Sequence, residues 1–355
     1  MLPFVGDLDV AHVHVQAPTD VVFLCGGPCT DLSQPTPVSL RDAFLKIVEN
    51  KALVNRNLVQ AEDISRLALF TDCYSDLLAF ETEFAQITEL ILLFCESEGS
   101  LAELGAFAMV PDIASRLMVV MRDKYWEADS FVKLGPLRFL EKQYGSRSVF
   151  VLNDSDLALR GSTPTESTIP ILKALLEPPI AERLKNTREP TTFVSSRPGH
   201  LIKLAVGLIQ EYGALTTKEL VDAFAAFSIT KTETELSGYL LCAKSVGWIT
   251  EQRRGHTNYF VAKDNLPDAA TLRAKEDAKI KNKARRRLMI RDHWKQADPP
   301  LLQLGRAPEI RRQEPVLGRR SAESCVASGA STLSGRNQGS AHGGTRERLN
   351  VRHHR

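Results

Sequence analysis

The 355-residue chain is long enough for two domains with attachments, at roughly 150 residues per domain. Hydrophobic residues make up 43% of it and charged residues 25%, which excludes a wholly disordered or fibrous protein. The formal net charge of +2 hides an asymmetry, because residues 271–355 contain 20 Lys or Arg against eight Asp or Glu. This arm therefore carries +12, and residues 1–270 carry −10. A cationic arm usually contacts nucleic acid, and a solvated tail that only aids solubility is the alternative.

Neither a membrane span nor a secretory signal is predicted. The longest apolar run, Leu90–Cys95, is far shorter than the roughly 20 residues that cross a bilayer. The first residues lack a basic segment followed by an apolar one. Cys25 and Cys29 have no second Cys or His pair nearby, so no metal site is expected. We therefore expect a cytoplasmic protein with reduced cysteines and no membrane contact.

Residues 21–152 alternate between short apolar runs and segments with helical spacing. This alternation predicts an α/β fold, with a mostly parallel sheet that helices cover on both faces. In such open sheets, ligands bind at the carboxyl ends of the strands. The expected helices include Ser39–Glu49 and Leu77–Thr88. The expected strands are Val21–Cys25, Asn57–Ala61, Leu90–Cys95, Leu117–Met121 and Ser148–Leu152.

Two of these strand ends are candidate binding loops. The first strand leads into Gly26 and Gly27, where bare backbone allows a ligand to approach closely, although a plain turn is the alternative. The strand Leu90–Cys95 leads into a loop and a helix with Ser100 at the expected N-cap, whose free amides can hold a phosphate or a ribosyl hydroxyl. Glu103 follows three residues later, so a capping box with Ser100 is the structural alternative.

The stretch 94–108, FCESEGSLAELGAFA, resembles the D-x-G-T-x-x-E-x-G-x-A signature of nucleoside 2-deoxyribosyltransferases. It is more similar still to the ES-x-GS-x-AELGAF signature of the deoxyribosyltransferase-like effectors of type II retrons. The Glu of the signature is catalytic in both groups, which implies that Glu103 is the catalytic residue. The segment FETEFA is similar to the L-E-N-x-L-A helix of the retron group and places Glu81 at its acidic position. The Leu24–Gly27 turn matches that group's first nucleotide-binding loop.

This resemblance implies an N-glycosidase that cleaves NAD⁺ or a related nucleotide as substrate, without a cofactor. It also implies a toxin in anti-phage defence, controlled by a retron reverse transcriptase and its multicopy single-stranded DNA (msDNA), and a homo-oligomer. Glu98 stands where transferases have Asp, and contacts for an acceptor base are not identifiable, so cleavage is favoured over base exchange. The implied substrate-binding residues beside Glu103 are Gly26, Gly27, Glu81, Ser97, Gly99 and Ser100.

Two carboxylates suit this chemistry. Breaking a ribosyl C1–N bond builds positive charge on the sugar, and a carboxylate beneath C1 either stabilises the cation or attacks it. Glu103 fits this role. Glu81 could bind sugar hydroxyls or shift the pKa of the first carboxylate, because nearby like charges push two carboxyl pKa values apart.

The pattern changes after residue 160. Pro, Ser and Thr are abundant in residues 160–199 around one helical piece, Ile169–Leu184, which predicts a linker with a packed helix. Three helices and a hairpin with the basic turn Arg253–His256 then resemble a winged helix-turn-helix. Glu233 and Glu235, near the start of the presumed recognition helix, would face phosphates unfavourably. A structured nucleic acid or a protein partner is therefore favoured over sequence-specific reading of a duplex.

The basic segment Leu272–Gln296 is polar on every face, so we expect a helix that orders on phosphates or on a partner. The composition beyond Pro300 predicts disorder. The expected contacts to nucleic acid or a partner are Arg253, Arg254, Lys283, Arg285, Arg286 and Arg287.

The expected domain order has five parts. An N-glycosidase domain, residues 1–158, precedes a linker at 159–199, a winged helix at 200–265, a basic helix at 266–298 and a disordered tail at 299–355. Two alternatives stay open. One is a DNA-binding regulator whose α/β domain only senses a nucleotide, and the other is a true nucleoside deoxyribosyltransferase or phosphoribohydrolase.

Overall fold

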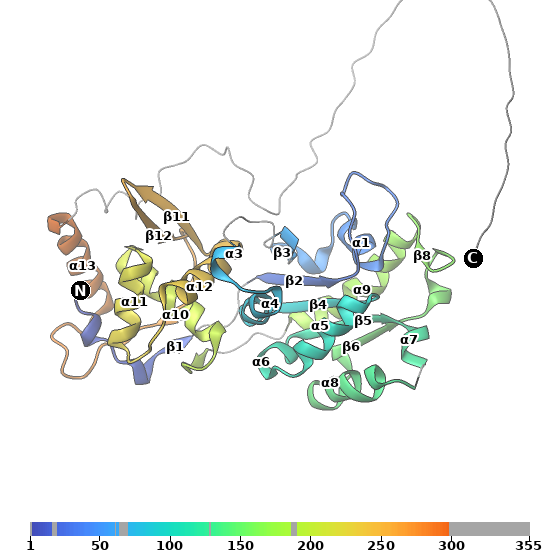
Figure 1. Cartoon of the computed structure of the whole chain (residues 1–355), viewed down its shortest axis with the longest axis horizontal. Coiled ribbons are helices and arrows are strands. Elements are labelled where there is room, and N and C mark those ends of the chain that lie inside the picture. Colours follow the sequence, from blue (N-terminus) through green and yellow to red (C-terminus); the bar gives the residue numbers. More distant parts are fainter. Residues whose placement is uncertain are drawn as a thin grey trace, which may run out of the picture. The chain divides into compact units, whose positions relative to one another are not determined.

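The computed structural model describes residues 2–15, 20–60, 62–63, 70–127, 129–185 and 190–297. A five-stranded parallel sheet with the order β3-β2-β4-β5-β6 holds the first half of the chain together (Figure 1). The predicted α/β fold with a parallel sheet is thus confirmed. Its strands are β2 Val21–Gly26, β3 Asn57–Gln60, β4 Leu90–Cys95, β5 Leu117–Arg122 and β6 Val149–Leu152.

The two central strands are apolar almost throughout, and every residue of β4 and β5 is buried. Continuous burial is what a sheet covered on both faces requires, because successive side chains point to opposite faces. Val21, Phe23 and Cys25 lie in one cluster with helices α4 Leu77–Ala85, α5 Glu98–Ala108 and α8 Arg138–Tyr144. Val22 and Leu24 lie in the other cluster with helices α1 Leu40–Leu45 and α9 Thr168–Leu184.

Helix α9 comes from the segment that the sequence predicts to be a linker. Its Leu172, Leu176 and Ile180 are fully buried in the cluster of α1 and the sheet. Burial of each such side chain stabilises the fold by about 1.5–3 kcal/mol. The segment therefore covers the parallel sheet as one of its layers and does more than connect two domains.

The strand order creates a switch point between β2 and β4. The chain leaves β2 toward β3 on one side and returns to β4 on the other side of β2. In open α/β sheets, ligands bind in the crevice outside the strand ends at such a point. The loops after β2 and β4 are therefore where the fold favours a ligand.

The second half of the chain contains helices α10 Pro198–Tyr212, α11 Thr217–Ala226 and α12 Glu233–Ser245. Capping boxes start α11 at Thr216 and α12 at Thr232. The predicted helices and hairpin are present, and the arrangement as a winged helix stays a prediction. Strands β10 Ala214–Leu215, β11 Ile249–Arg254 and β12 Thr257–Ala262 form an antiparallel sheet with the order β10-β12-β11.

Helix α12 contacts the N-terminal region through Tyr74, next to helix α3 Phe70–Cys73. The Tyr74 hydroxyl donates to Glu83 Oε2 at 2.7 Å and lies 3.2 Å from the Cys242 thiol. A Cβ at Gly238 would come within 3.1 Å of Tyr74, so glycine allows this close approach. The presumed recognition helix is therefore packed against the chain itself along one side.

The basic helix is shorter than predicted and spans α13 Lys283–Ala297. Contrary to the expectation of a helix polar on every face, Ile290 and Arg286 are buried, and Trp294 Nε1 donates to the Tyr212 carbonyl at 3.2 Å. Helix α13 thus packs against α10. The predicted disordered tail lies outside the described residues.

Within the described part of the chain, no helix has both the length and the apolar character needed to cross a membrane.

The remaining elements are short. These elements are β1 His14–Val15, β7 Leu159–Arg160, β8 Thr163–Pro164, β9 Thr191–Thr192, β13 Ala270–Thr271, α6 Pro111–Ala114, α7 Asp123–Glu127, a π-helical turn Lys133–Leu137, and 3₁₀ turns Val5–Asp7, Val10–His12, Lys51–Leu53, Ser146–Ser148 and Asp154–Asp156.

Candidate active site

The switch point brings the glycine turn after β2 against the end of β4. Gly26 pairs with Phe94 and has a φ of +132°, and a Cβ there would lie 2.4 Å from the Phe94 carbonyl oxygen. A Cβ at Gly27 would lie 2.7 Å from the Glu96 side chain. Gly26 therefore requires glycine, because a larger residue would force the two strand ends apart, whereas a larger residue at Gly27 would have to displace the Glu96 side chain.

The start of α5 differs from the sequence prediction. Ser97, not Ser100, is the N-cap, and its Oγ accepts from the Ser100 amide at 3.3 Å. Ser100 Oγ in turn accepts from the amides of Ser97 at 2.9 Å and Glu96 at 3.0 Å. The capping box is therefore made of two serines, and Glu103 takes no part in it. The Ser100 side chain is buried in this box, which closes it to direct contact with a substrate, whereas Gly99 is exposed.

Glu103 is left with an unusual buried oxygen. Its Oε2 is inaccessible to solvent and has no hydrogen-bond partner among the described residues. Burial raises the pKa of Glu103 to about 7, the charge of Arg41 lowers that pKa, and the charge of Glu62 raises it. A buried carboxylate oxygen without a hydrogen-bond partner is costly to keep, so its presence on the helix that follows β4 points to a ligand rather than to stability.

Glu81 is the second acid of the site. It lies on α4 and is almost completely buried. Burial, and then the charges of Glu103 and Glu62, raise the pKa of Glu81 to about 8. Both carboxyl groups therefore have pKa values raised toward neutral pH. The charges of Glu81 and Glu103 both act on Cys25, which directly precedes the Gly26–Gly27 turn, so these groups lie in one region, and their roles toward a substrate stay predictions.

Arg41 on α1 is central to this site and was missed by the sequence analysis. Its buried guanidinium donates to both oxygens of Glu62, each at 2.7 Å. It also donates to the carbonyl oxygens of Leu24 at 3.1 Å and Gly27 at 3.2 Å. These hydrogen bonds hold the backbone of the glycine turn in place. The available signal was a charged residue inside the apolar helical pattern of α1.

Glu96 is another residue to which the sequence analysis gave no role. Its Oε2 accepts from the Leu40 amide at 2.8 Å and its Oε1 from the Arg41 amide at 2.9 Å. Burial raises the pKa of Glu96, and these hydrogen bonds from the start of α1 oppose that change. Glu96 therefore ties the end of β4 to the helix that carries Arg41.

The residues expected to contact nucleic acid or a partner fall into different environments. The predicted contact of Arg286 with nucleic acid or a partner is corrected, because its side chain is buried and its Nε donates to the buried Glu211 at 2.6 Å. Arg287 pairs with Glu211 at 2.9 Å, and Lys283 pairs with Asp268. Three of the expected contacts thus hold α13 in place. Arg253 and Arg285 are exposed, and Arg254 is half-buried.

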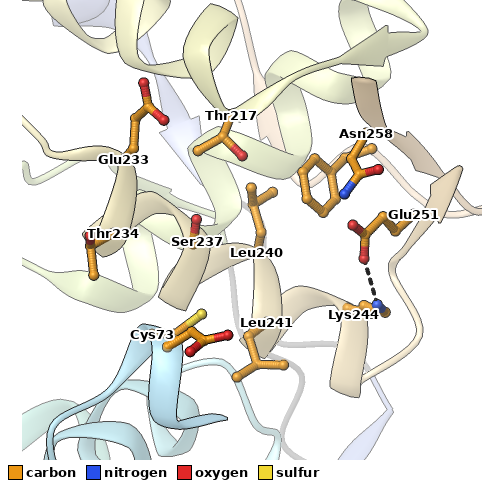
Figure 2. A pocket seen from close by; sticks show the side chains of 12 residues that line it. Cys73, Thr217, Glu233, Thr234, Ser237, Leu240, Leu241, Lys244, Glu251 and Asn258 are labelled. Atoms are coloured by element: carbon orange, nitrogen blue, oxygen red, sulfur yellow. Dashed lines mark hydrogen bonds and ion pairs between the residues drawn. The ribbon is translucent and has the colours of Figure 1, made fainter. Parts of the chain in front are cut away.

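A pocket of about 370 Å³ lies between α11, α12, the hairpin and the end of α3 (Figure 2). Three carboxylates line it, from Asp72, Glu233 and Glu251, together with Lys244, which pairs with Glu251 at 2.8 Å. No predicted substrate-binding residue lines this pocket. Its acidic lining disfavours phosphates at this face of α12.

Within the described ranges, no group of three or more His, Cys, Asp or Glu side chains could hold a metal ion.

Comparison with known families identifies the broad class of the protein. The family model described as STM3845 retron effector protein matches residues 37–251, more than half of the chain. The chain belongs to this retron effector family. The matched span includes Arg41, Glu62, Glu81, Glu96 and Glu103, and it excludes the glycine turn and α13.

Two Escherichia coli proteins are similar to this retron effector. The "Retron Ec86 putative ribosyltransferase/DNA-binding protein" is 29% identical over 136 residues, which cover 38% of this chain and 42% of the relative. The "Retron Ec73 putative ribosyltransferase/DNA-binding protein" is 29% identical over 124 residues, which cover 34% and 38%. The chain thus spans about two fifths of the length of these relatives. The predicted kinship with retron effectors is confirmed, and the deoxyribosyltransferase-like type stays a prediction.

Proposed function

We propose that this retron effector is an N-glycosidase that cleaves the bond between base and ribose in NAD⁺ or a related nucleotide. The observation that carries the proposal is the buried, unpartnered Glu103 Oε2 at the topological switch point of the sheet. The ribosyltransferase names of the relatives support the same class of bond chemistry.

The reaction follows from the two carboxyl groups. As the C1–N bond breaks, its electron pair goes to the base nitrogen, and ionised Glu103 stabilises or attacks the cationic C1. A neutral base needs a proton to leave, and Glu81, with its raised pKa, supplies one. Nicotinamide leaves NAD⁺ as a neutral molecule without a proton. Water then adds at C1, which breaks the C1–O bond to Glu103 where one has formed, and the water gives its proton to a carboxylate of the pair.

The C-terminal region carries the second part of the proposal. We infer that α10–α12 and the β11–β12 hairpin form a winged helix that holds the retron's reverse transcriptase and msDNA. The exposed Arg253 of the hairpin and the exposed Arg285 of α13 supply the cationic contacts, since the acidic pocket beside α12 disfavours a duplex backbone there. In this proposal the protein is a defence toxin, and the assembly keeps the glycosidase inactive until phage infection.

A substrate panel tests the proposal. The full chain, with and without reverse transcriptase and msDNA, is incubated with NAD⁺, nucleosides or nucleoside monophosphates, and base release is followed by chromatography. We expect nicotinamide or one base to be released, and an added acceptor base to leave the products unchanged. Products carrying the acceptor base would indicate a transferase. No release under any of these conditions would contradict the enzyme and favour the nucleotide-sensing regulator.

A further inference from the structure

Glu62 lies at the carboxyl edge of the strand next to the glycine turn. In the register of β2 and β3, Leu24 pairs with Gln60. Glu62 follows Gln60 by two residues, beyond the end of β3, and Gly26 is the last residue of β2. Glu62 thus follows the strand next to β2, and Arg41 Nη1 joins its carboxylate to the Gly27 carbonyl of the glycine turn.

The carboxylate of Glu62 is held rigidly and yet reaches solvent. Its Oε1 and Oε2 accept from Nη1 and Nη2 of Arg41, both at 2.7 Å. The Arg41 side chain is only 2% exposed, whereas that of Glu62 is 49% exposed. A two-pronged pair of this kind fixes the plane of the carboxylate. The buried arginine therefore presents an oriented carboxylate at the mouth of the switch point.

The carboxylate has the chemistry to bind a sugar. An ionised carboxylate oxygen accepts more than one hydrogen bond, and about half of the Glu62 side chain is exposed, so its oxygens can accept from the vicinal hydroxyls of ribose. In other nucleotide-binding α/β sheets, an acidic residue at the end of the second strand binds ribose hydroxyls beside a glycine turn. The charge of Glu62 also raises the pKa of both Glu81 and Glu103, so the three carboxylates share one site.

We propose that Glu62, fixed by Arg41, binds the 2′- and 3′-hydroxyls of the substrate and selects ribosyl over 2′-deoxyribosyl compounds. The inference rests on the proposed function for the position of the sugar, and it narrows the substrate class. It separates this retron effector from a true deoxyribosyltransferase, whose substrates lack the 2′-hydroxyl.

Equilibrium binding tests the proposal without depending on turnover. The probes are NAD⁺ and matched pairs of ribonucleoside and 2′-deoxyribonucleoside 5′-monophosphates, with full-length Glu103→Gln as the parent to prevent cleavage. We expect the parent to bind the ribo member of at least one pair about tenfold more tightly than the deoxy member. The deoxy member lacks the 2′-hydroxyl and so loses a hydrogen bond to a charged group. Adding Glu62→Gln should bring the two members of that pair to within about twofold.

A matched control is available on the same sheet. Glu89 also pairs with an arginine fork, from Arg56 at 3.1 and 3.2 Å, and it directly precedes β4 at the opposite, amino edge. Glu89→Gln should keep the full preference for the ribo compound. Thermal melting of both variants verifies that they are folded.

The outcomes separate this inference from the proposed function. A ribo preference that depends on Glu62, together with no base release by the wild type, would keep the inference and reject the glycosidase. Base release without a ribo preference, or a preference that Glu62→Gln leaves intact, would overturn the inference. Failure to bind any probe would overturn it as well.

Discussion

At the scale of single residues, the candidate site is an electrostatic compromise around one buried arginine. Arg41 lowers the pKa of Glu81 and Glu103, while Glu62 raises both. Burial is the largest cause of both raised values, so each acid titrates far above an ordinary carboxyl group. The site is therefore set for proton transfer near neutral pH.

This charge arrangement predicts the pH dependence of base release. Glu103 must be ionised, so the rate should fall as the pH drops through about 7. Glu81 must be protonated for a neutral base to leave, so for nucleosides the rate should also fall as the pH rises through about 8. NAD⁺ needs no such proton and should lack the alkaline fall. Initial rates from pH 5 to 10 measure both limbs, and an acid limb near an ordinary carboxyl pKa of 4.5 would contradict the assignment.

At the scale of elements, helix α13 shows how a basic segment can be structural. Arg286 and Glu211 form a buried ion pair that attaches α13 to α10, and Arg287 closes it from the outside. Breaking a buried pair leaves an unpaired buried charge, which costs about 3–5 kcal/mol. The basic character of the helix therefore stabilises a packing contact at this position.

Substitution within α13 tests this role. Arg286→Met should lower the free energy of unfolding by about 3 kcal/mol, because Glu211 would remain buried without its main partner. Arg285→Met, on the exposed neighbour, should change it by no more than about 0.5 kcal/mol. Denaturant titration of both full-length variants compares the two values. Equal decreases in the free energy of unfolding for the two variants would show that the buried ion pair stabilises the protein no more than an exposed charge does.

At the scale of the whole molecule, the sequence predicts those features that depend on the spacing of neighbouring residues along the chain. The strands of the parallel sheet were readable because continuous burial makes β4 and β5 apolar almost throughout. The signature around Glu103 was readable because strand, loop and helix follow one another in the chain. The glycine turn was readable for the same reason, since Gly26 ends β2 and Gly27 directly follows it.

Contacts between distant segments could not be read in this way. The partner of Arg41 lies 21 residues away, and the partner of Arg286 lies 75 residues away. Charged residues usually face solvent, so both arginines were expected at the surface or were overlooked. The N-cap was misplaced because Ser97 and Ser100 are both capping residues, and spacing alone does not choose between them.

The central claim is that Glu103 acts on the ribosyl carbon, and one comparison of rates tests it most directly. Nicotinamide release from NAD⁺, or release of the base that the substrate panel identifies, is measured for the wild type, Glu103→Gln and Glu98→Gln. Glu98 is exposed in the first turn of the same helix and serves as the matched control. We predict that Glu103→Gln lowers the rate by about a thousandfold or more, roughly 4 kcal/mol of lost transition-state stabilisation, while Glu98→Gln stays near the wild-type rate. Equal rates for Glu103→Gln and Glu98→Gln would contradict the account.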